Sequence, residues 1–155
     1  MPQGIATYSD TEKKALSAYT KLMRAAESVT GRTARILAAS NLTVSQFGIL
    51  EALFHKGSLC QRELAAKILK STGNITMVID NLEKHNLVRR ERAQYDRRFI
   101  AIHLTDSGRL LIEHVFPLIM AAIVKEMSIL QDSEQEELAQ LCRRIGLQEK
   151  TVQGG

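Results

Sequence analysis

Residues 87–105 read LVRRERAQYDRRFIAIHLT, and this stretch decides the fold. Its centre holds five arginines against two acidic residues, a net charge of +3. The run FIAIHL at 99–104 then alternates between two sets of side chains, which is typical of a strand with one buried face. The rest of the chain has helical periodicity, so the sequence predicts one basic β-hairpin in an α-helical protein. A lone hairpin is marginally stable in water, so this one must pack on a helix and its arginines must have a partner.

Composition bounds the class of protein. The chain has 155 residues, a single-domain length, with 45% hydrophobic residues and a net charge of +4, which permits an anionic partner. Cys60 and Cys142 lie far apart and form no CxxC, so we expect no zinc site and no cofactor. The N-terminus lacks a signal-peptide pattern, and the apolar segment Val115–Val124 is short of the ~20 residues of a membrane span. We therefore expect a cytoplasmic protein with reduced thiols and no membrane partner.

Helix-start signals divide the chain into segments. Four S/T-x-x-E/Q capping boxes precede apolar periodic runs, at 9–12, 43–46, 58–61 and 133–136. They predict helices over 9–38, 43–56, 61–69 and 133–146, with two more over 72–85 and 106–130. Asn86 is placed for a left-handed cap, and Pro117 invites a kink in the long helix. We expect Cys142 in the core because it lies on an apolar face.

The helices at 61–69 and 72–85, joined by a tight polar turn, form the pattern of a helix-turn-helix. Hydroxyls and amides on the second helix can bind phosphates or read base edges, and a methionine can contact thymine methyls. The residues predicted to face DNA are Ser71, Thr72, Asn74, Thr76, Met77, Asn81 and Lys84. The hairpin directly after it, residues 88–104, is then a wing. The alternatives are a merely solvated polar face, or a protein-interaction module that binds an acidic partner.

Three motifs carry a resemblance to the MarR family of winged-helix transcriptional regulators. Residues 96–105 resemble its D-x-R-x5-L-T wing signature, and residues 75–84 are similar to its recognition helix. Thr105-Asp-Ser-Gly108 matches the T-x-x-G that opens its long C-terminal helix. The resemblance extends over residues 10–147. It implies a mainly α fold with a small β-hairpin wing, in which a winged helix-turn-helix lobe at 43–105 lies between dimerisation helices at 9–38 and 106–147.

The resemblance also implies a function. We expect a homodimeric transcriptional regulator, with repression as the expected sense, that binds a palindromic operator. Helix 72–85 would enter the major groove and wing 88–104 the minor groove. Asp96 would order the wing, Arg98 would insert into the minor groove, and Arg97 would assist. The apolar stripes of the terminal helices fit a twofold dimer, although the same helices could instead pack within one chain.

Two departures and the sensing mechanism stay open. Met77 and Asn81 stand where the family often has arginine, which weakens guanine readout and favours apolar and shape contacts. Similar proteins are released by small phenolic or aromatic ligands. The alternative is redox control through Cys60 at a helix start, although a small buried cysteine explains the same position. No phosphate loop, nucleophile elbow or metal spacing is found in the sequence, so we expect no enzyme and no metal site.

Overall fold

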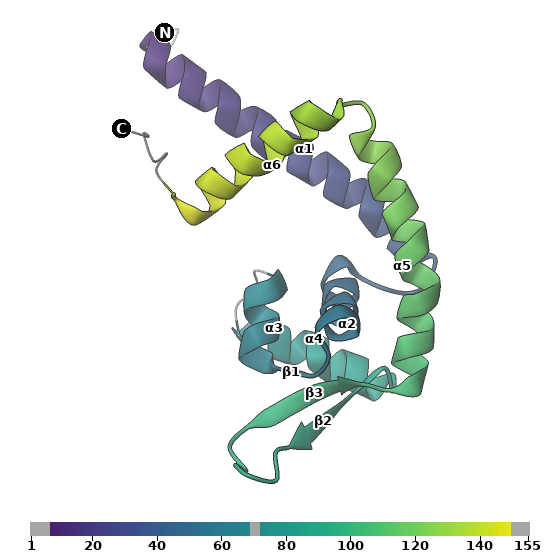
Figure 1. Ribbon diagram of the computed structural model, residues 1–155. Coiled ribbons are helices and arrows are strands. Elements are labelled where there is room, and N and C mark those ends of the chain that lie inside the picture. The colour runs from purple at the N-terminus through teal and green to yellow at the C-terminus, as the bar shows by residue number, and fades with distance from the viewer. Residues whose placement is uncertain (1–6, 69–71, 150–155) are drawn as a thin grey trace, which may run out of the picture. The chain divides into compact units, whose positions relative to one another are not determined.

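The structure, a computed structural model, describes residues 7–68 and 72–149. Their order is α1 (Asp10–Ala38), α2 (Val44–Lys56), β1 (Leu59–Cys60), α3 (Gln61–Ile68), α4 (Thr72–Lys84), β2 (Val88–Arg92), β3 (Ile100–Leu104), α5 (Asp106–Met127) and α6 (Asp132–Leu147) (Figure 1). The expected fold class, mainly α with a small β wing, is confirmed. Two compact units divide within α5, one up to Pro117 and one from Leu118 onward.

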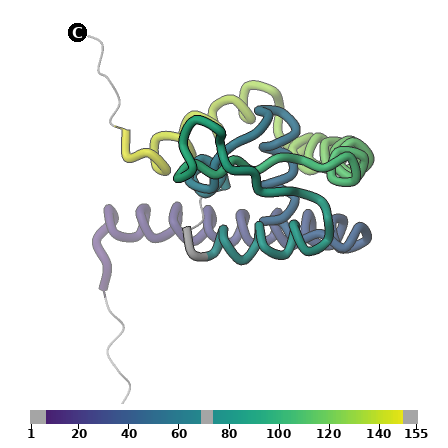
Figure 2. The backbone as a smooth tube through the Cα atoms, turned by 90° about the horizontal axis from the view of Figure 1, so that it is seen from below, coloured from purple at the N-terminus to yellow at the C-terminus, as the bar shows by residue number. Residues whose placement is uncertain are grey.

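Local hydrogen bonds explain where the first two helices begin. At α1, the Ser9 N–H donates to the Glu12 carboxylate at 2.7 Å, and the Glu12 N–H donates to the Ser9 hydroxyl at 3.2 Å. Thr43 and Gln46 exchange the same two bonds before α2, at 2.9 and 3.1 Å. Both predicted capping boxes are therefore confirmed. Figure 2 shows that α1 then runs on as one uninterrupted helix.

The other two predicted capping boxes are wrong in register. The carboxylate of Glu63 accepts the backbone N–H of Cys60 at 2.9 Å, so α3 begins after Cys60. Ser58 does not cap the helix because its hydroxyl is hydrogen-bonded to His103 on β3. At α6, the Gln131 N–H donates to Glu134 at 2.8 Å, and the helix begins at Asp132. In both cases a glutamate in the first turn selects a start that differs from the Ser-based prediction.

The sheet has a third strand that the sequence did not predict. Its order is β1–β3–β2, and both pairings are antiparallel. Val88 pairs with Leu104 and Arg92 with Ile100 across the hairpin, while Leu59 pairs with Ile102 on the other side of β3. The expectation of an isolated strand pair is therefore wrong. The sequence does not reveal β1 because a two-residue strand is too short to show period-2 alternation. The third strand gives the wing support that a lone hairpin lacks.

The core of the first unit fixes the orientation of α4. Buried side chains come from α1, α2, α3, α4, the sheet and the start of α5, and they include Leu37, Ile49, Leu50, Leu53, Leu64, Ile75, Ile79, Leu82, Val88, Ile102, Ile112 and Val115. Each buried leucine or isoleucine stabilises the fold by roughly 1.5–3 kcal/mol. Because Ile75, Ile79 and Leu82 lie on one side of α4, the opposite side must face solvent.

The T-x-x-G motif fastens the end of the hairpin to the turn after α4. Asn86 has a φ of 57°, which confirms the predicted left-handed cap. The Thr105 hydroxyl donates to the Asn86 carbonyl at 2.6 Å and accepts the Gly108 N–H at 3.0 Å. A Cβ on Gly108 would lie 2.0 Å from the Leu87 carbonyl oxygen, so this position requires glycine. The motif therefore serves a close backbone approach.

The second unit leaves apolar side chains uncovered. α6 contains no buried residue, and Leu138, Leu141 and Ile145 on one stripe are all exposed. The expectation that Cys142 lies in the core is wrong, because it is exposed on this same helix. None of the described helices has both the length and the apolar content to span a bilayer.

Candidate nucleic-acid interface

The outer side of α4 presents the expected mixture of side chains. Asn74, Asn81 and Lys84 are exposed, and Met77 is 73% exposed. These positions lie opposite the buried face of the helix. Ser71 lies outside the described residues, and for Thr72 the structure describes only its place at the start of α4. The surface thus combines amides, one cation and a large apolar side chain, all of which can contact DNA grooves or phosphates.

Thr76 has a structural contact in addition to its predicted contact with DNA. Its side chain is half-buried and its hydroxyl accepts a hydrogen bond from the Gln61 amide nitrogen. This bond links the first turn of α3 to α4, so it helps to set the angle between the two helices. Sequence reasoning missed Gln61 because the two partners are 15 residues apart and share no local pattern.

Arg90 connects the wing to α4. Its backbone N–H donates to Glu83 Oε2 and its Nη1 donates to Glu83 Oε1, both at 2.9 Å, while its Nη2 is bonded to Asp80. The Arg90 side chain is only 24% exposed. Two carboxylates on α4 therefore neutralise this guanidinium, which is one of the five arginines of the hairpin. Its partner is α4, so this guanidinium is engaged within the protein.

A second polar group crosses the sheet. Arg89 pairs with Glu91 on β2, and the Glu91 carboxylate lies 3.5 Å from His103 Nε2 on β3. The other ring nitrogen of His103 is hydrogen-bonded to Ser58, the residue before β1. The chain of contacts joins β2 and β3 to the residue before β1, so Arg89 is also engaged within the sheet.

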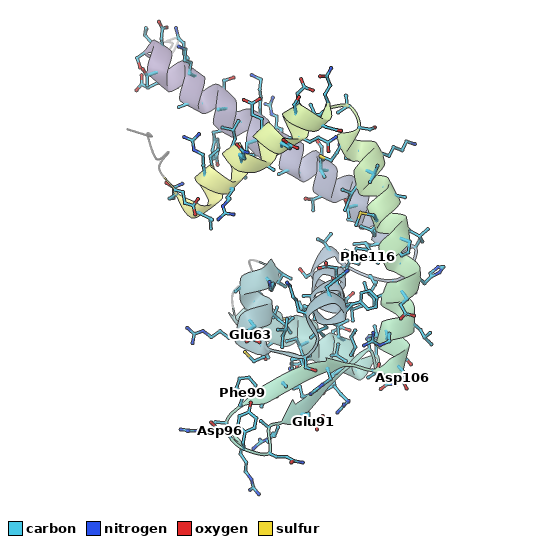
Figure 3. All side chains as sticks on the ribbon, viewed as in Figure 1. Glu63, Glu91, Asp96, Phe99, Asp106 and Phe116 are labelled. Atoms are coloured by element: carbon cyan, nitrogen blue, oxygen red, sulfur yellow. The ribbon has the colours of Figure 1, made fainter. Side chains whose placement is uncertain are left out.

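The turn of the wing holds the predicted D-x-R pair. Asp96 Oδ1 accepts the backbone N–H of Arg98 at 3.0 Å and its Nε at 3.3 Å. The Ala93 N–H donates to the Phe99 carbonyl at 2.9 Å and closes the turn. Figure 3 places Asp96 and Phe99 at the far end of the hairpin. The Arg98 side chain is 93% exposed, so Asp96 holds the Nε of its guanidinium while the two terminal nitrogens stay open to a partner.

Three arginines gather at this end, and we call Arg92, Arg97 and Arg98 the tip cations. Arg92 and Arg97 line a shallow hollow of about 390 Å³ together with Ala93 and Gln94. Within the described residues, no carboxylate pairs with Arg92 or Arg97. The tip cations are therefore the part of the original arginine group that can neutralise an external anion.

Comparisons with known proteins agree with this geometry. A family profile described as "Transcriptional regulator SarA/Rot" matches residues 33–115, more than half of the chain. The chain is 32% identical to the HTH-type transcriptional regulator MhqR of Bacillus subtilis (strain 168) over 138 residues, which are 89% of this chain and 95% of MhqR. Its fold is similar to that of Sco3205, a MarR family transcriptional regulator from Streptomyces coelicolor solved in complex with DNA. The TM-score is 0.82 at 20% identity, and the match covers 98% of this chain and 96% of Sco3205.

The chain belongs to the MarR family of transcriptional regulators. It is a winged-helix protein that binds DNA. The fold is also similar to that of Bordetella bronchiseptica BpsR, whose DNA binding is regulated by 6-hydroxynicotinic acid. The TM-score to BpsR is 0.76 at 23% identity, with 84% of this chain and 98% of BpsR covered.

Cys60 is the residue that the sequence predicts as a redox sensor in this MarR family protein. Cys60 is half-buried in β1, and its backbone N–H is bonded to the Glu63 carboxylate. A predicted redox role for Cys60 stays a prediction. In the part of the chain that the structure describes, no three His, Cys, Asp or Glu side chains are placed to hold a metal ion.

Proposed function

We propose that this MarR family protein is a homodimeric repressor of a palindromic operator. In each copy, α4 enters a major groove and wing 88–104 enters the adjacent minor groove. The observation that carries this proposal is the attachment of Arg90 to Glu83 and Asp80, because it fastens the wing to α4, the helix that carries the other predicted DNA contacts. The DNA complex of the similarly folded Sco3205 supports the same use of the fold.

The residues of this surface divide by task. Lys84 and the hydroxyls of Ser71 and Thr72 contact phosphates, while Asn74, Thr76, Met77 and Asn81 face base edges. Arg98 enters the minor groove with Arg97 beside it, and Asp96 orders the turn. A narrow A·T-rich minor groove has enhanced negative potential, which favours an arginine there.

Uncovered surface on the terminal helices supports the homodimer, with residues 9–38 and 106–147 as the dimerisation helices. α6 exposes Leu138, Leu141 and Ile145, and α1 exposes Leu16, Tyr19 and Met23. A second copy that covers these apolar stripes would place two recognition helices about one DNA turn apart, ~34–36 Å.

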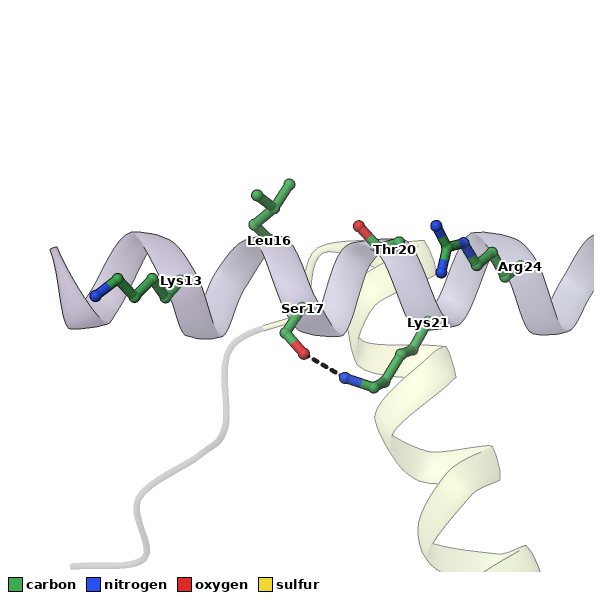
Figure 4. Close-up of a pocket in the computed structure, with 6 residues that line it drawn as sticks. All are labelled: Lys13, Leu16, Ser17, Thr20, Lys21 and Arg24. Carbon is green, nitrogen blue, oxygen red and sulfur yellow. Dashed lines mark hydrogen bonds between the residues drawn. The ribbon is translucent and has the colours of Figure 1, made fainter. Parts of the chain in front are cut away.

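Charge on the same helices also fits a second copy. Lys13, Lys21 and Arg24 lie along α1 with Leu16, Ser17 and Thr20, around a shallow hollow of about 320 Å³ (Figure 4). The first turns of α6 are acidic, with exposed Asp132, Glu134, Glu136 and Glu137. We infer that the acidic start of α6 in one copy faces the basic stripe of α1 in the other.

The repressor acts in the cytoplasm and is released by a small aromatic or phenolic ligand. The regulation of BpsR by 6-hydroxynicotinic acid, an aromatic hydroxy acid, supports a ligand of this class. Oxidation of Cys60 is the alternative. Cys60 immediately precedes α3, so a bulky oxidised sulfur there would disturb the helix-turn-helix.

One experiment tests the proposal. Fragments of the source genome are selected for binding, and a selected duplex is titrated at several salt concentrations with the parent protein and an Arg98→Ala variant. We expect palindromic fragments, affinity that falls steeply with salt, and a slope reduced by about one for Arg98→Ala. Release by phenols or quinones supports ligand sensing, and release by peroxide that is lost in Cys60→Ser supports redox sensing. Absence of duplex binding at low salt would overturn the proposal in favour of an acidic protein partner.

A further inference from the structure

An aromatic pair lies beside the arginines at the end of the wing. The rings of Tyr95 and Phe99 are stacked, with centroids 6.4 Å apart and planes inclined by 30°. Tyr95 is nevertheless 84% exposed, and Phe99 is exposed as well. A tyrosine that supported the core would be covered. Together the two adjacent exposed rings form an apolar surface that a partner can cover.

The backbone of the turn links this pair to the D-x-R motif. The Phe99 N–H donates to the Asp96 carbonyl at 3.0 Å, and the Phe99 carbonyl accepts the Ala93 N–H at 2.9 Å. Asp96 also holds the backbone of Arg98. Tyr95, Phe99 and Arg98 therefore belong to one short turn that these bonds hold together.

The chemistry of the tip identifies the partner surface. Arg97 and Arg98 lie between Tyr95 and Phe99 in the sequence, and an anionic partner with apolar edges fits both the cations and the rings. The minor groove of DNA has this combination, with phosphates at its rims and deoxyribose C–H groups along its walls. Phe99 restricts the Tyr95 ring before binding, which lowers the ordering cost of the contact.

We propose that Tyr95, supported by Phe99, packs its free ring face against the deoxyribose wall of the minor groove that Arg98 enters. This inference rests on the proposed DNA-binding function. A ring–sugar contact displaces no counterions, so it adds affinity that does not depend on salt. The wing then contributes to DNA affinity in two separable ways. The contribution of the tip cations depends on salt, and the contribution of Tyr95 does not.

The test uses the full chain and one selected duplex, titrated between roughly 50 and 200 mM salt. Tyr95→Ala is expected to weaken binding by about fivefold to tenfold at every salt concentration, with the slope of log K against log salt unchanged. Tyr95→Phe keeps the ring and is expected to keep parental affinity. Tyr8→Ala is the matched control, because it removes another exposed tyrosine ring, ahead of α1, and should bind as the parent does.

Three results would overturn the inference. Parental affinity of Tyr95→Ala would show that the ring makes no contact, and a reduced salt slope would show that the variant only displaced an arginine. Equal losses in Tyr95→Phe and Tyr95→Ala would assign the effect to the hydroxyl. If the parent itself binds no duplex, the proposed function fails and this inference with it, which is a distinct outcome from failure of Tyr95 alone.

Discussion

Arg90 donates to both carboxylate oxygens of Glu83, through its backbone N–H and through Nη1, each at 2.9 Å. This pair joins β2 to α4 and helps to set the orientation of the wing on that helix. We predict that Arg90→Gln lowers operator affinity by about tenfold while the free energy of unfolding falls by only about 1 kcal/mol, since the pair is partly exposed. Fluorescence anisotropy and chemical denaturation measure the two quantities.

Arg89→Gln is the matched control for Arg90→Gln. It removes the same charge from the same strand, but Arg89 pairs with Glu91 on its own strand and fastens no helix. The charge of Arg90 is already neutralised by Glu83 and Asp80. Its removal should therefore leave unchanged the slope of log K for DNA binding against log salt. A slope reduced by about one in Arg90→Gln would mean that Arg90 contacts phosphate, which contradicts the structural role.

Gly108 tests whether the T-x-x-G motif is required for the close backbone approach to Leu87. Alanine is a better helix former than glycine by about 1 kcal/mol, yet its Cβ would lie 2.0 Å from the Leu87 carbonyl oxygen. That oxygen also accepts the Thr105 N–H at 3.2 Å, so it cannot move freely. We predict that Gly108→Ala destabilises the protein by about 2 kcal/mol or more.

Gly31 in α1 is the matched control for Gly108, because a Cβ there meets nothing within 4 Å. Gly31→Ala should stabilise the protein by roughly 0.5–1 kcal/mol. Thermal unfolding followed by circular dichroism shows whether each substitution raises or lowers the stability of the protein. Equal effects of the two substitutions would show that the close approach to Leu87 is not what requires glycine.

Glu12 gives the N-terminus of α1 a dependence on pH. The backbone N–H of Ser9, and less strongly its hydroxyl, holds the pKa of the Glu12 carboxyl below its usual value of 4.5. A lowered pKa in the folded chain means that the ionised carboxylate stabilises this helix end above the unfolded pKa, and the contribution disappears as pH falls through the folded pKa. The first turn of α1 should therefore fray in acid.

Ser9 variants separate the two causes of the Glu12 shift. Ser9 has a φ of −64°, so proline fits there and removes both the N–H donor and the hydroxyl, whereas alanine removes the hydroxyl alone. In an NMR titration, Ser9→Pro should return the Glu12 pKa close to its usual value, whereas Ser9→Ala should leave most of the shift. If Ser9→Ala also returns the Glu12 pKa close to its usual value, the hydroxyl is the main cause.

Leu141 tests the dimer. It is exposed on α6 within the apolar stripe that we assign to a second copy. Leu141→Glu should produce monomers in sedimentation velocity and weaken operator binding by about two orders of magnitude, because each half-site then binds alone. Val44→Glu adds the same charge at an exposed aliphatic residue at the start of α2, outside the dimerisation helices, and should leave the dimer intact. A dimeric Leu141→Glu protein would contradict the assignment.

The fold could largely be predicted because local signals agreed with each other. The bonds of Ser9 with Glu12 and of Thr43 with Gln46, and the left-handed Asn86, each follow from short-range chemistry. β1 could not be predicted, since its two residues form a strand only through their partners Ile102 and Ala101 on β3. The burial expected for Cys142 failed because an apolar stripe does not specify whether its own chain or another copy covers it.

The candidate site could be predicted only where its contacts join residues that are close in the sequence. Asp96 and Arg98 lie two residues apart, and the bond between them follows from a short motif. The attachment of Arg90 to Asp80 and the bond of Gln61 to Thr76 join separate elements, so only the tertiary structure shows them. The arginine group therefore read as one basic cluster in the sequence, although the structure divides it into internal pairs and tip cations.

Met77 tests which residue sets the base preference. It is 73% exposed on α4, and an apolar side chain there cannot donate to guanine. Met77→Arg supplies a bidentate donor, and we predict that one position of each half-site shifts toward guanine by roughly 1–3 kcal/mol of discrimination. Selection of bound sequences from a random pool measures the shift. Met77→Leu keeps an apolar contact and should keep the parental preference, so the same sequences from all three proteins would show that Met77 does not face the bases.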